Sequence, residues 1–215
     1  FVVLPTIRLL DVCNKHNVKL FYFSSGGAIY GENKCGKPFK ETDALNPISY
    51  YGLSKLIIEA SIRLEHNANG LKYNILRPSN PYGIGQIIDG KQGFIANALA
   101  KAMNGLPITI WGDGSVVRDY IYIDDLAECV YSIVEKEIDN ATINIGSGKG
   151  ISLNDVLKVI EDVVGRKIQV DYTEKRKCDV SSLVLDTTEM NRIYSPNLTT
   201  LKDGISKLYN HLLTK

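Results

Sequence analysis

Short apolar runs alternate along this chain with longer segments in which apolar residues return every three or four positions. The first pattern is typical of buried β-strands and the second of amphipathic helices. Together they predict helices over residues 2–17, 49–68, 94–103, 124–137, 153–164, 187–193 and 201–213, and strands over residues 19–23, 71–76, 108–111, 120–123, 142–145 and 167–172. Strands that alternate with helices in this way indicate an α/β protein with a mostly parallel sheet.

Turn and cap residues mark the ends of several of these elements. A Ser-Ser-Gly-Gly turn at residues 24–27 is expected to end the first strand, and the polar residues 32–47 predict a long loop. Asp124-Asp125 and Ser152 are expected to cap the helices that follow them. Two helices are predicted from apolar stripes, which consist of Val3, Ile7, Leu10 and Cys13 in residues 2–17 and of Leu53, Ile57, Ala60 and Leu64 in residues 49–68.

Composition narrows the class of protein. The 215 residues contain 25 Lys and Arg against 24 Asp and Glu, and this balance gives no electrostatic reason to expect nucleic acid or an acidic membrane surface as a partner. No apolar run reaches the length of about 18 residues that a membrane span needs, and no secretory signal pattern is visible. The four cysteines are scattered and the three histidines lack metal-ligand spacing, so we expect a reduced, cytoplasmic protein without a bound metal.

The most specific local pattern lies at the start of the helix predicted over residues 49–68. Tyr51 and Lys55 stand four residues apart there, so both side chains lie on one face of the helix. A lysine ammonium held near a phenol favours the phenolate, which makes the tyrosine a general base for removing a proton from a hydroxyl group. A single Tyr-x-x-x-Lys match also arises by chance, so its context decides between chemistry and coincidence.

That context consists of two strand ends. The strand at 19–23 ends in the turn of residues 24–27, and the next strand ends in residues 76–83. Open α/β sheets bind ligands at the carboxyl ends of their strands. Both segments and the Tyr51–Lys55 pair are therefore expected to lie around one site.

Six segments, taken in order, are characteristic: residues 24–31 (SSGGAIYG), 51–55 (YGLSK), 76–83 (LRPSNPYG), 111–114 (WGDG), 118–125 (RDYIYIDD) and 143–148 (INIGSG). With them the chain resembles, over nearly its whole length, the nucleotide-sugar epimerase/dehydratase branch of the extended short-chain dehydrogenase/reductases. This resemblance implies a Rossmann-type parallel sheet with a smaller C-terminal α/β substrate domain, and NAD as cofactor. It also implies epimerisation of a UDP-hexose at C4 through a 4-keto intermediate.

The resemblance assigns a cofactor side to the site. Tyr51 is implied to be the acid/base that exchanges a proton with the sugar 4-hydroxyl, and Lys55 to hold the nicotinamide ribose. The same comparison places Ser24 and Ser25 beside this pair and lines the nicotinamide with Pro78 and Ser79.

The substrate side follows in the same way. By resemblance, Asn80 binds near the substrate diphosphate, and Arg118 and Arg176 meet the two phosphates, for which the planar fork of arginine is suited. Asp179 is implied to accept a hydrogen bond from the nucleotide ribose. Thr109 and Trp111 are implied to lie beside the uridine, where an aromatic ring can stack on a base.

One position departs from the family pattern. Many epimerases carry Ser or Thr at the third position of the turn, where this chain has Gly26, so Ser25 is the candidate to supply that oxygen. The dehydratases of the branch place an Asp-Glu pair where this chain has Gly27-Ala28, and this difference argues against dehydration. Another nucleotide-sugar dehydrogenase, reductase or decarboxylase, or an inactive sugar-nucleotide-binding fragment, stays open as an alternative.

The beginning of the chain also bears on the fold. The family opens with a Gly-x-x-Gly-x-x-Gly turn that cradles the cofactor pyrophosphate, and no such motif occurs here. We therefore expect the first βαβ part of the Rossmann fold to be missing and this fragment alone to be inactive. Residues 1–78 plus about 118–142 are predicted to form a partial NAD-binding domain, and about 79–117 and 143–215 the nucleotide-sugar-binding domain. The family also implies a homodimer formed through the helices at 2–17 and 49–68.

Overall fold

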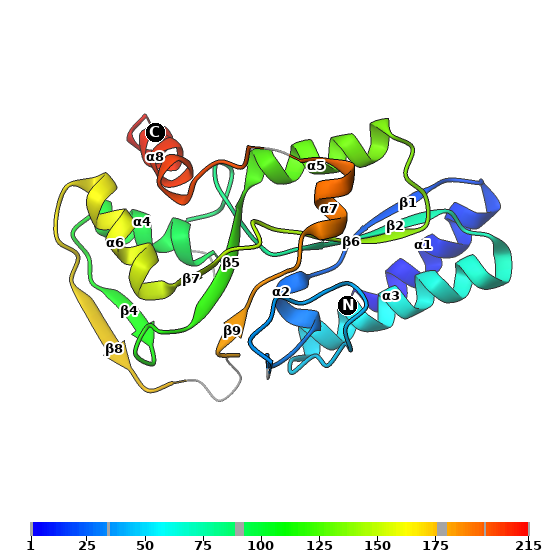
Figure 1. The fold of residues 1–215 in the computed structure, drawn as a ribbon, viewed down its shortest axis with the longest axis horizontal. Coiled ribbons are helices and arrows are strands. Elements are labelled where there is room, and N and C mark those ends of the chain that lie inside the picture. Colours follow the sequence, from blue (N-terminus) through cyan, green and yellow to red (C-terminus); the bar gives the residue numbers. More distant parts are fainter. Residues whose placement is uncertain (1, 34, 89–92, 176–179, 196, 215) are drawn as a thin grey trace.

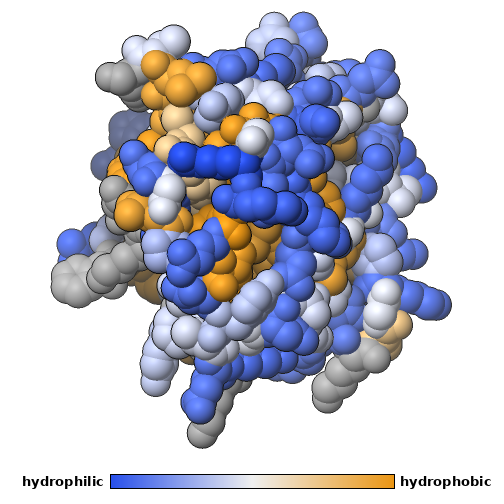
Figure 2. Space-filling model, turned by 90° about the vertical axis from the view of Figure 1, so that its left-hand side faces the viewer, coloured by the Kyte–Doolittle hydropathy of each residue, from blue (hydrophilic) through white to orange (hydrophobic). Residues whose placement is uncertain are grey.

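The structure is a computed structural model that describes residues 2–33, 35–88, 93–175, 180–195 and 197–214. Three small sheets follow one another along the long axis of the molecule, with helices packed on their faces (Figure 1). The end that carries the third sheet presents mainly hydrophilic side chains, with hydrophobic ones visible between them (Figure 2). No helix in the described part of the chain is both long and apolar enough to cross a lipid bilayer.

The first sheet is parallel throughout. It has the order β1 (Leu20–Phe23), β2 (Tyr73–Pro78), β6 (Ala141–Ile145). Helices α1 (Val3–Lys15) and α3 (Tyr50–Asn69) lie below it in Figure 1, whereas α5 (Ile123–Glu135) and α7 (Thr188–Ile193) lie above it. Two apolar cores form between these layers, one on each side of the sheet. A parallel sheet covered on both faces is the arrangement that the alternating sequence pattern predicts.

The other two sheets follow toward the opposite end. The second contains β3 (Asn80–Tyr82), β5 (Val117–Tyr122), β7 (Gly150–Ser152) and β9 (Ser182–Leu183), and the third pairs β4 (Ile108–Trp111) with β8 (Val170–Thr173). Helices α4 (Phe94–Met103), α6 (Leu153–Val164) and α8 (Leu201–Leu213) enclose the largest apolar core around them. The predicted boundary between residues 142 and 143 falls inside β6, whose pairing with β2 continues to Ile145. The division into two domains stays a prediction.

Several local expectations need correction. The turn after β1 is a short helix, α2 (Gly26–Ile29), and the short strands β7 and β9 were not predicted at all. Asp124 and Asp125 lie inside the first turn of α5, whose N-cap is Tyr122. The Asp125 carboxylate instead accepts hydrogen bonds from the backbone N–H and the hydroxyl of Thr199, so it ties α5 to the segment before α8.

The cap of α6 is confirmed. The Ser152 hydroxyl accepts a hydrogen bond from the backbone N–H of Asp155, and Gly165 ends the helix with a φ of 75°.

Helix α3 does not bury the stripe from which it was predicted. Leu53, Ile57 and Leu64 are 43%, 41% and 68% exposed, whereas Gly52, Ile58, Glu59 and Ile62 are buried. Helix α1 buries Leu10 and Cys13 of its predicted stripe, but Ile7 of the same stripe is 41% exposed, and Leu4, Leu9 and Val12 are exposed as well. An apolar surface therefore lies on the outer side of both helices.

Candidate functional site

A cleft of about 550 Å³ lies where β1 and β2 end, at the junction with the second and third sheets. Its lining includes residues from the end of β1 and α2, from the start of α3, from the β2–β3 connection and from β4 and β5. Most of the predicted site residues meet there, namely Ser24, Ser25, Tyr51, Pro78, Ser79, Asn80, Thr109, Trp111 and Arg118. Arg176 and Asp179 lie outside the described residues, so their predicted roles stay predictions.

Tyr51 and Lys55 form a pair on α3. The Lys55 Nζ lies 5.6 Å from the centroid of the Tyr51 ring and donates a hydrogen bond of 2.7 Å to the carbonyl of Phe23 at the end of β1. Because this ammonium is half-buried, desolvation lowers the pKa of Lys55 below its ordinary value. The phenol faces the cleft and the cation lies beside its ring, which is the arrangement a proton-accepting tyrosine requires.

Local packing fixes where the pair stands. The Ser49 side chain accepts a hydrogen bond from Gly52 N–H and so caps α3 at its start. A Cβ atom on Gly52 would lie only 2.3 Å from the carbonyl oxygen of Ala28. Glycine at this position therefore lets the first turn of α3 lie directly against α2.

Two buried serines line the cleft close to Tyr51. Ser24 and Ser79 are 4% and 5% exposed. The Ser24 hydroxyl lies close enough to the Glu59 carboxylate to help lower its pKa. The Ser79 Oγ has no hydrogen-bond partner among the described residues, so it is placed to bind a ligand or water. Pro78 lies beside them at the end of β2.

The structure explains why residue 26 is glycine. A Cβ atom at Gly26 would lie 2.6 Å from Leu185 Cδ1 and 3.0 Å from the carbonyl oxygen of Arg77. At Gly27, by contrast, the nearest atoms to a Cβ would be Asn80 Oδ1 at 3.6 Å and Ser25 Oγ at 3.9 Å. A side chain at position 26 would therefore require Leu185 to move, and Ser25 is the side chain of the turn that approaches the open part of the cleft.

The buried carboxylate of Asp119 accepts a hydrogen bond from the Leu185 backbone and so fixes its position. Asp119 accepts hydrogen bonds from the backbone N–H groups of Ser147, Gly148 and Leu185. Burial raises the pKa of Asp119 above its ordinary value, although these hydrogen bonds oppose the shift. The backbone of Leu185, whose side chain contacts the Gly26 position, is therefore fixed through Asp119 to the backbone of Ser147 and Gly148.

The opposite wall carries the predicted nucleotide contacts. Asn80 Nδ2 donates to the carbonyl of Asp119 at 2.8 Å, which fixes its side chain at the cleft. Arg118 donates from Nη1 to the carbonyls of Val117 and Val180, both at 2.9 Å. Trp111 is 43% exposed at the end of β4, so its ring offers a surface for stacking.

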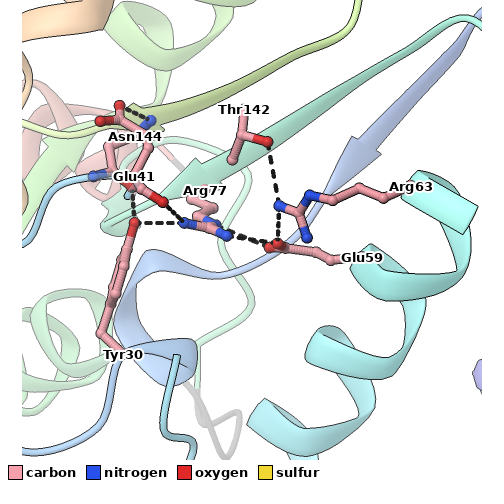
Figure 3. A network of polar contacts seen from close by, with 7 residues as sticks. All are labelled: Tyr30, Glu41, Glu59, Arg63, Arg77, Thr142 and Asn144. Atoms are coloured by element: carbon pink, nitrogen blue, oxygen red, sulfur yellow. Dashed lines mark hydrogen bonds and ion pairs between the residues drawn. The ribbon is translucent and has the colours of Figure 1, made fainter. Parts of the chain in front are cut away.

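Beneath the cleft lies a buried ion pair that the sequence prediction did not identify (Figure 3). Arg77 donates from Nε and Nη2 to the two carboxylate oxygens of Glu59 at 3.0 and 2.6 Å, and both residues are almost completely buried. Arg77 also donates to the Tyr30 hydroxyl, which donates to Asn144 Oδ1. Arg63 contacts Glu59 from the next turn of α3.

The pair joins the two elements that carry the chemistry. Burial opposes ionisation of Glu59, but the hydrogen bonds and charge of Arg77 outweigh it and lower the pKa of the Glu59 carboxyl. Glu59 lies one turn beyond Lys55 on α3, and Arg77 directly precedes Pro78 on β2. The spacing of Lys55 and Glu59 places both on one face of α3, but the partner Arg77 lies on a different strand, so the sequence alone did not reveal this link.

Known proteins resemble this chain in sequence and in fold. A model of the NAD dependent epimerase/dehydratase family matches residues 3–146. The chain belongs to this family. A relative described as a dTDP-4-dehydro-6-deoxyglucose reductase, from Escherichia coli, is 39% identical over 199 residues and aligns with 92% of this chain and 62% of its own length. A putative UDP-glucose 4-epimerase of Methanocaldococcus jannaschii is 34% identical over 210 residues, which cover 97% of this chain and 68% of that protein.

A solved structure extends the comparison to the fold. The UDP-glucose 4-epimerase of Thermotoga maritima, crystallised with UDP-glucose, superimposes with a TM-score of 0.91 at 34% identity and covers 98% of this chain. This confirms the Rossmann-type α/β fold for this member of the NAD-dependent epimerase/dehydratase family. The chain spans between 62% and 69% of the lengths of these three proteins.

Proposed function

We propose that this chain carries the catalytic and substrate-binding residues of an NAD-dependent UDP-hexose 4-epimerase. The observation that carries the proposal is the Tyr51 phenol, which faces the cleft with the Lys55 ammonium 5.6 Å from its ring. Trp111 and Arg118 line the same cleft and offer a stacking surface and a cation. The family of the chain and the epimerases among its relatives support this activity.

The residues present fit the nicotinamide end of NAD. Ser24, Pro78 and Ser79 line the cleft together with Tyr51, and within the described residues the Ser79 hydroxyl has no hydrogen-bond partner. Lys55 supplies an ammonium for a ribose. When bound, the cofactor would accept a hydride from sugar C4 and return it. The sequence contains no Gly-x-x-Gly-x-x-Gly motif, so its residues do not account for pyrophosphate binding.

Proton transfer is then the task of Tyr51. Its phenolate oxygen accepts the proton of the sugar 4-hydroxyl as the C4–H bond breaks, and the nearby Lys55 charge stabilises that phenolate. After the 4-keto sugar has turned its other face, Tyr51 donates the same proton back to the C4 oxygen. Tyr51 therefore takes up and returns one proton in each turnover, so no proton has to be exchanged with solvent.

Neighbouring chemistries are distinguished by the lining of the cleft. Among the residues that the structure describes, the cleft lining contains no aspartate or glutamate, and Gly27 and Ala28 occupy the turn. Elimination of water by a pair of carboxylates is therefore disfavoured. A nucleotide-sugar reductase is the second candidate because the relative with 39% identity is described as one.

The decisive experiment measures interconversion of UDP-glucose and UDP-galactose by the full-length protein together with its net consumption of NAD(H). Tyr51→Phe is expected to lower kcat by about 100-fold or more while leaving UDP-sugar binding nearly unchanged, since it removes the acid/base oxygen. Tyr50→Phe is the matched control because the adjacent Tyr50 is 92% exposed. Near-parental turnover by the Tyr51 variant contradicts the assignment, and stoichiometric cofactor consumption by the parent favours the reductase.

Assembly and location complete the proposal. The exposed apolar side chains of α1 and α3 support a homodimer formed through these helices. Cys13, Cys35 and Cys129 are free thiols, which fits the expected cytoplasmic location. The near balance of charge continues to argue against nucleic acid or a membrane as partner.

A further inference from the structure

Tyr22 on β1 lies behind the catalytic pair. Side chains alternate along a strand, so Tyr22 and Ser24 point to the same face of the sheet. Tyr22 packs against the apolar core formed with α3, the helix that carries Tyr51, Lys55 and Glu59 at intervals of four residues. Tyr22 and Ser24 therefore face the side of α3 that carries Tyr51, Lys55 and Glu59.

The contacts between these rows centre on the lysine. The Lys55 Nζ lies 5.0 Å from the centroid of the Tyr22 ring and 5.6 Å from that of Tyr51, so the ammonium has an aromatic ring from each element beside it. Its hydrogen bond to the Phe23 carbonyl ties it to the residue next to Tyr22. Three contacts thus restrain a side chain that is otherwise flexible.

The Tyr22 hydroxyl takes no part in this arrangement. Its oxygen is buried and has no hydrogen-bond partner within the described residues. Burial raises the pKa of Tyr22, with further contributions from Glu59 and Tyr51, so the group stays a neutral phenol. An unpartnered buried hydroxyl costs stability, and the packing of the ring is what remains to account for an aromatic residue here.

We propose that Tyr22 is a positioning residue whose ring holds the Lys55 ammonium beside Tyr51. Glu59, four residues after Lys55 on α3, is paired with Arg77 and Arg63, so it does not replace this support. The titratable and charged groups that the structure places around Lys55 and Glu59 include Tyr22 on β1, Tyr51 and Arg63 on α3 and Arg77 on β2. The kinetic part of the inference rests on the proposed function, because Lys55 acts there through the Tyr51 phenolate.

The kinetic test compares Tyr22→Leu with Tyr22→Phe in the full-length protein. Loss of the ring is expected to lower kcat roughly 3- to 30-fold, the size of one cation–π contact, with KM within about twofold. Tyr22→Phe retains the ring and is expected to keep the parental kcat.

A matched control separates positioning from stability. Tyr73 lies on β2 in the same apolar core, but its ring contacts His66. Tyr73→Leu is expected to lower the thermal midpoint as Tyr22→Leu does, but to keep kcat and KM near the parental values. A parental kcat in Tyr22→Leu overturns the proposal, as does a loss in Tyr22→Phe equal to that in Tyr22→Leu.

A second measurement does not depend on epimerase activity. The order parameter of the Lys55 Cε methylene, obtained by NMR relaxation and assigned with Lys55→Arg, reports how firmly the side chain is held. It is expected to fall toward the value of exposed lysines in Tyr22→Leu and to stay parental in Tyr22→Phe. If the parent shows no epimerisation but Lys55 is released in Tyr22→Leu, the proposed function fails while the positioning role stands; an unchanged order parameter overturns that role.

Discussion

At the scale of single residues, the turn after β1 shows how one side chain decides the position of a functional oxygen. A Cβ atom at residue 26 would lie 2.6 Å from Cδ1 of Leu185, so a side chain there would need the space that Leu185 occupies. Ser25 lines the cleft and lies near Gly27, so we expect this residue to supply the serine oxygen of the turn.

Ser25→Ala tests whether Ser25 supplies the oxygen that many epimerases take from the residue at the position of Gly26. Removing the hydroxyl is expected to lower kcat about 10- to 100-fold, because one hydrogen bond to the reacting oxygen is lost in the transition state. Steady-state kinetics with UDP-glucose measures the effect. Ser61→Ala is the control, since the Ser61 hydroxyl is exposed and bonds only within α3. An unchanged kcat in Ser25→Ala would show that the reaction does not use this oxygen.

At the scale of elements, helix α3 shows what the sequence predicts and what it does not. Its span from the Ser49 cap to the left-handed Gly70 follows from local signals, and so does the spacing of Tyr51 and Lys55. Its buried face was not predictable, because the burial of Glu59 depends on Arg77, a residue of another strand. For the same reason the two-residue strand β9 carries no local pattern and exists only through its pairing with β5.

The Glu59–Arg77 pair predicts a pH-dependent stability. The pKa of Glu59 is lower in the folded protein than the ordinary value of 4.5, so its ionisation stabilises the fold above that pH. This stabilisation is lost as the pH falls through the folded-state pKa. Glu59→Gln is expected to lower the free energy of unfolding by about 3 kcal/mol at pH 7, and by clearly less near pH 3.

Urea unfolding at both pH values measures the difference. Glu189→Gln serves as the control, because Glu189 forms an exposed ion pair with Arg192 and is expected to change stability little at either pH. A loss in Glu59→Gln that is equally large at pH 3 and pH 7 would mean that packing, and not the charge, accounts for the role of Glu59.

At the scale of the whole molecule, helices α1 and α3 carry several exposed apolar side chains. Leu4, Leu9 and Val12 on α1 and Leu53, Ile57 and Leu64 on α3 are all exposed. The two helices pack against each other, so these side chains belong to one pair of neighbouring helices. Exposed apolar surface that extends over neighbouring elements is characteristic of protein–protein interfaces.

A homodimer through this surface makes the final prediction. Leu53→Glu with Ile57→Glu places two charges on the outer side of α3, and burying them in an interface would be strongly unfavourable. Light scattering coupled to gel filtration is expected to give a dimer for the parent and a monomer for the double variant. Leu213→Glu is the matched control, because Leu213 is 60% exposed on α8, at a different place in the fold. A dimer that persists in the double variant but not in the control would move the interface to the α8 side. Because Tyr51 and Lys55 lie on a different face of α3 from Leu53 and Ile57, a monomeric variant that keeps its turnover would show that each subunit holds a complete catalytic pair.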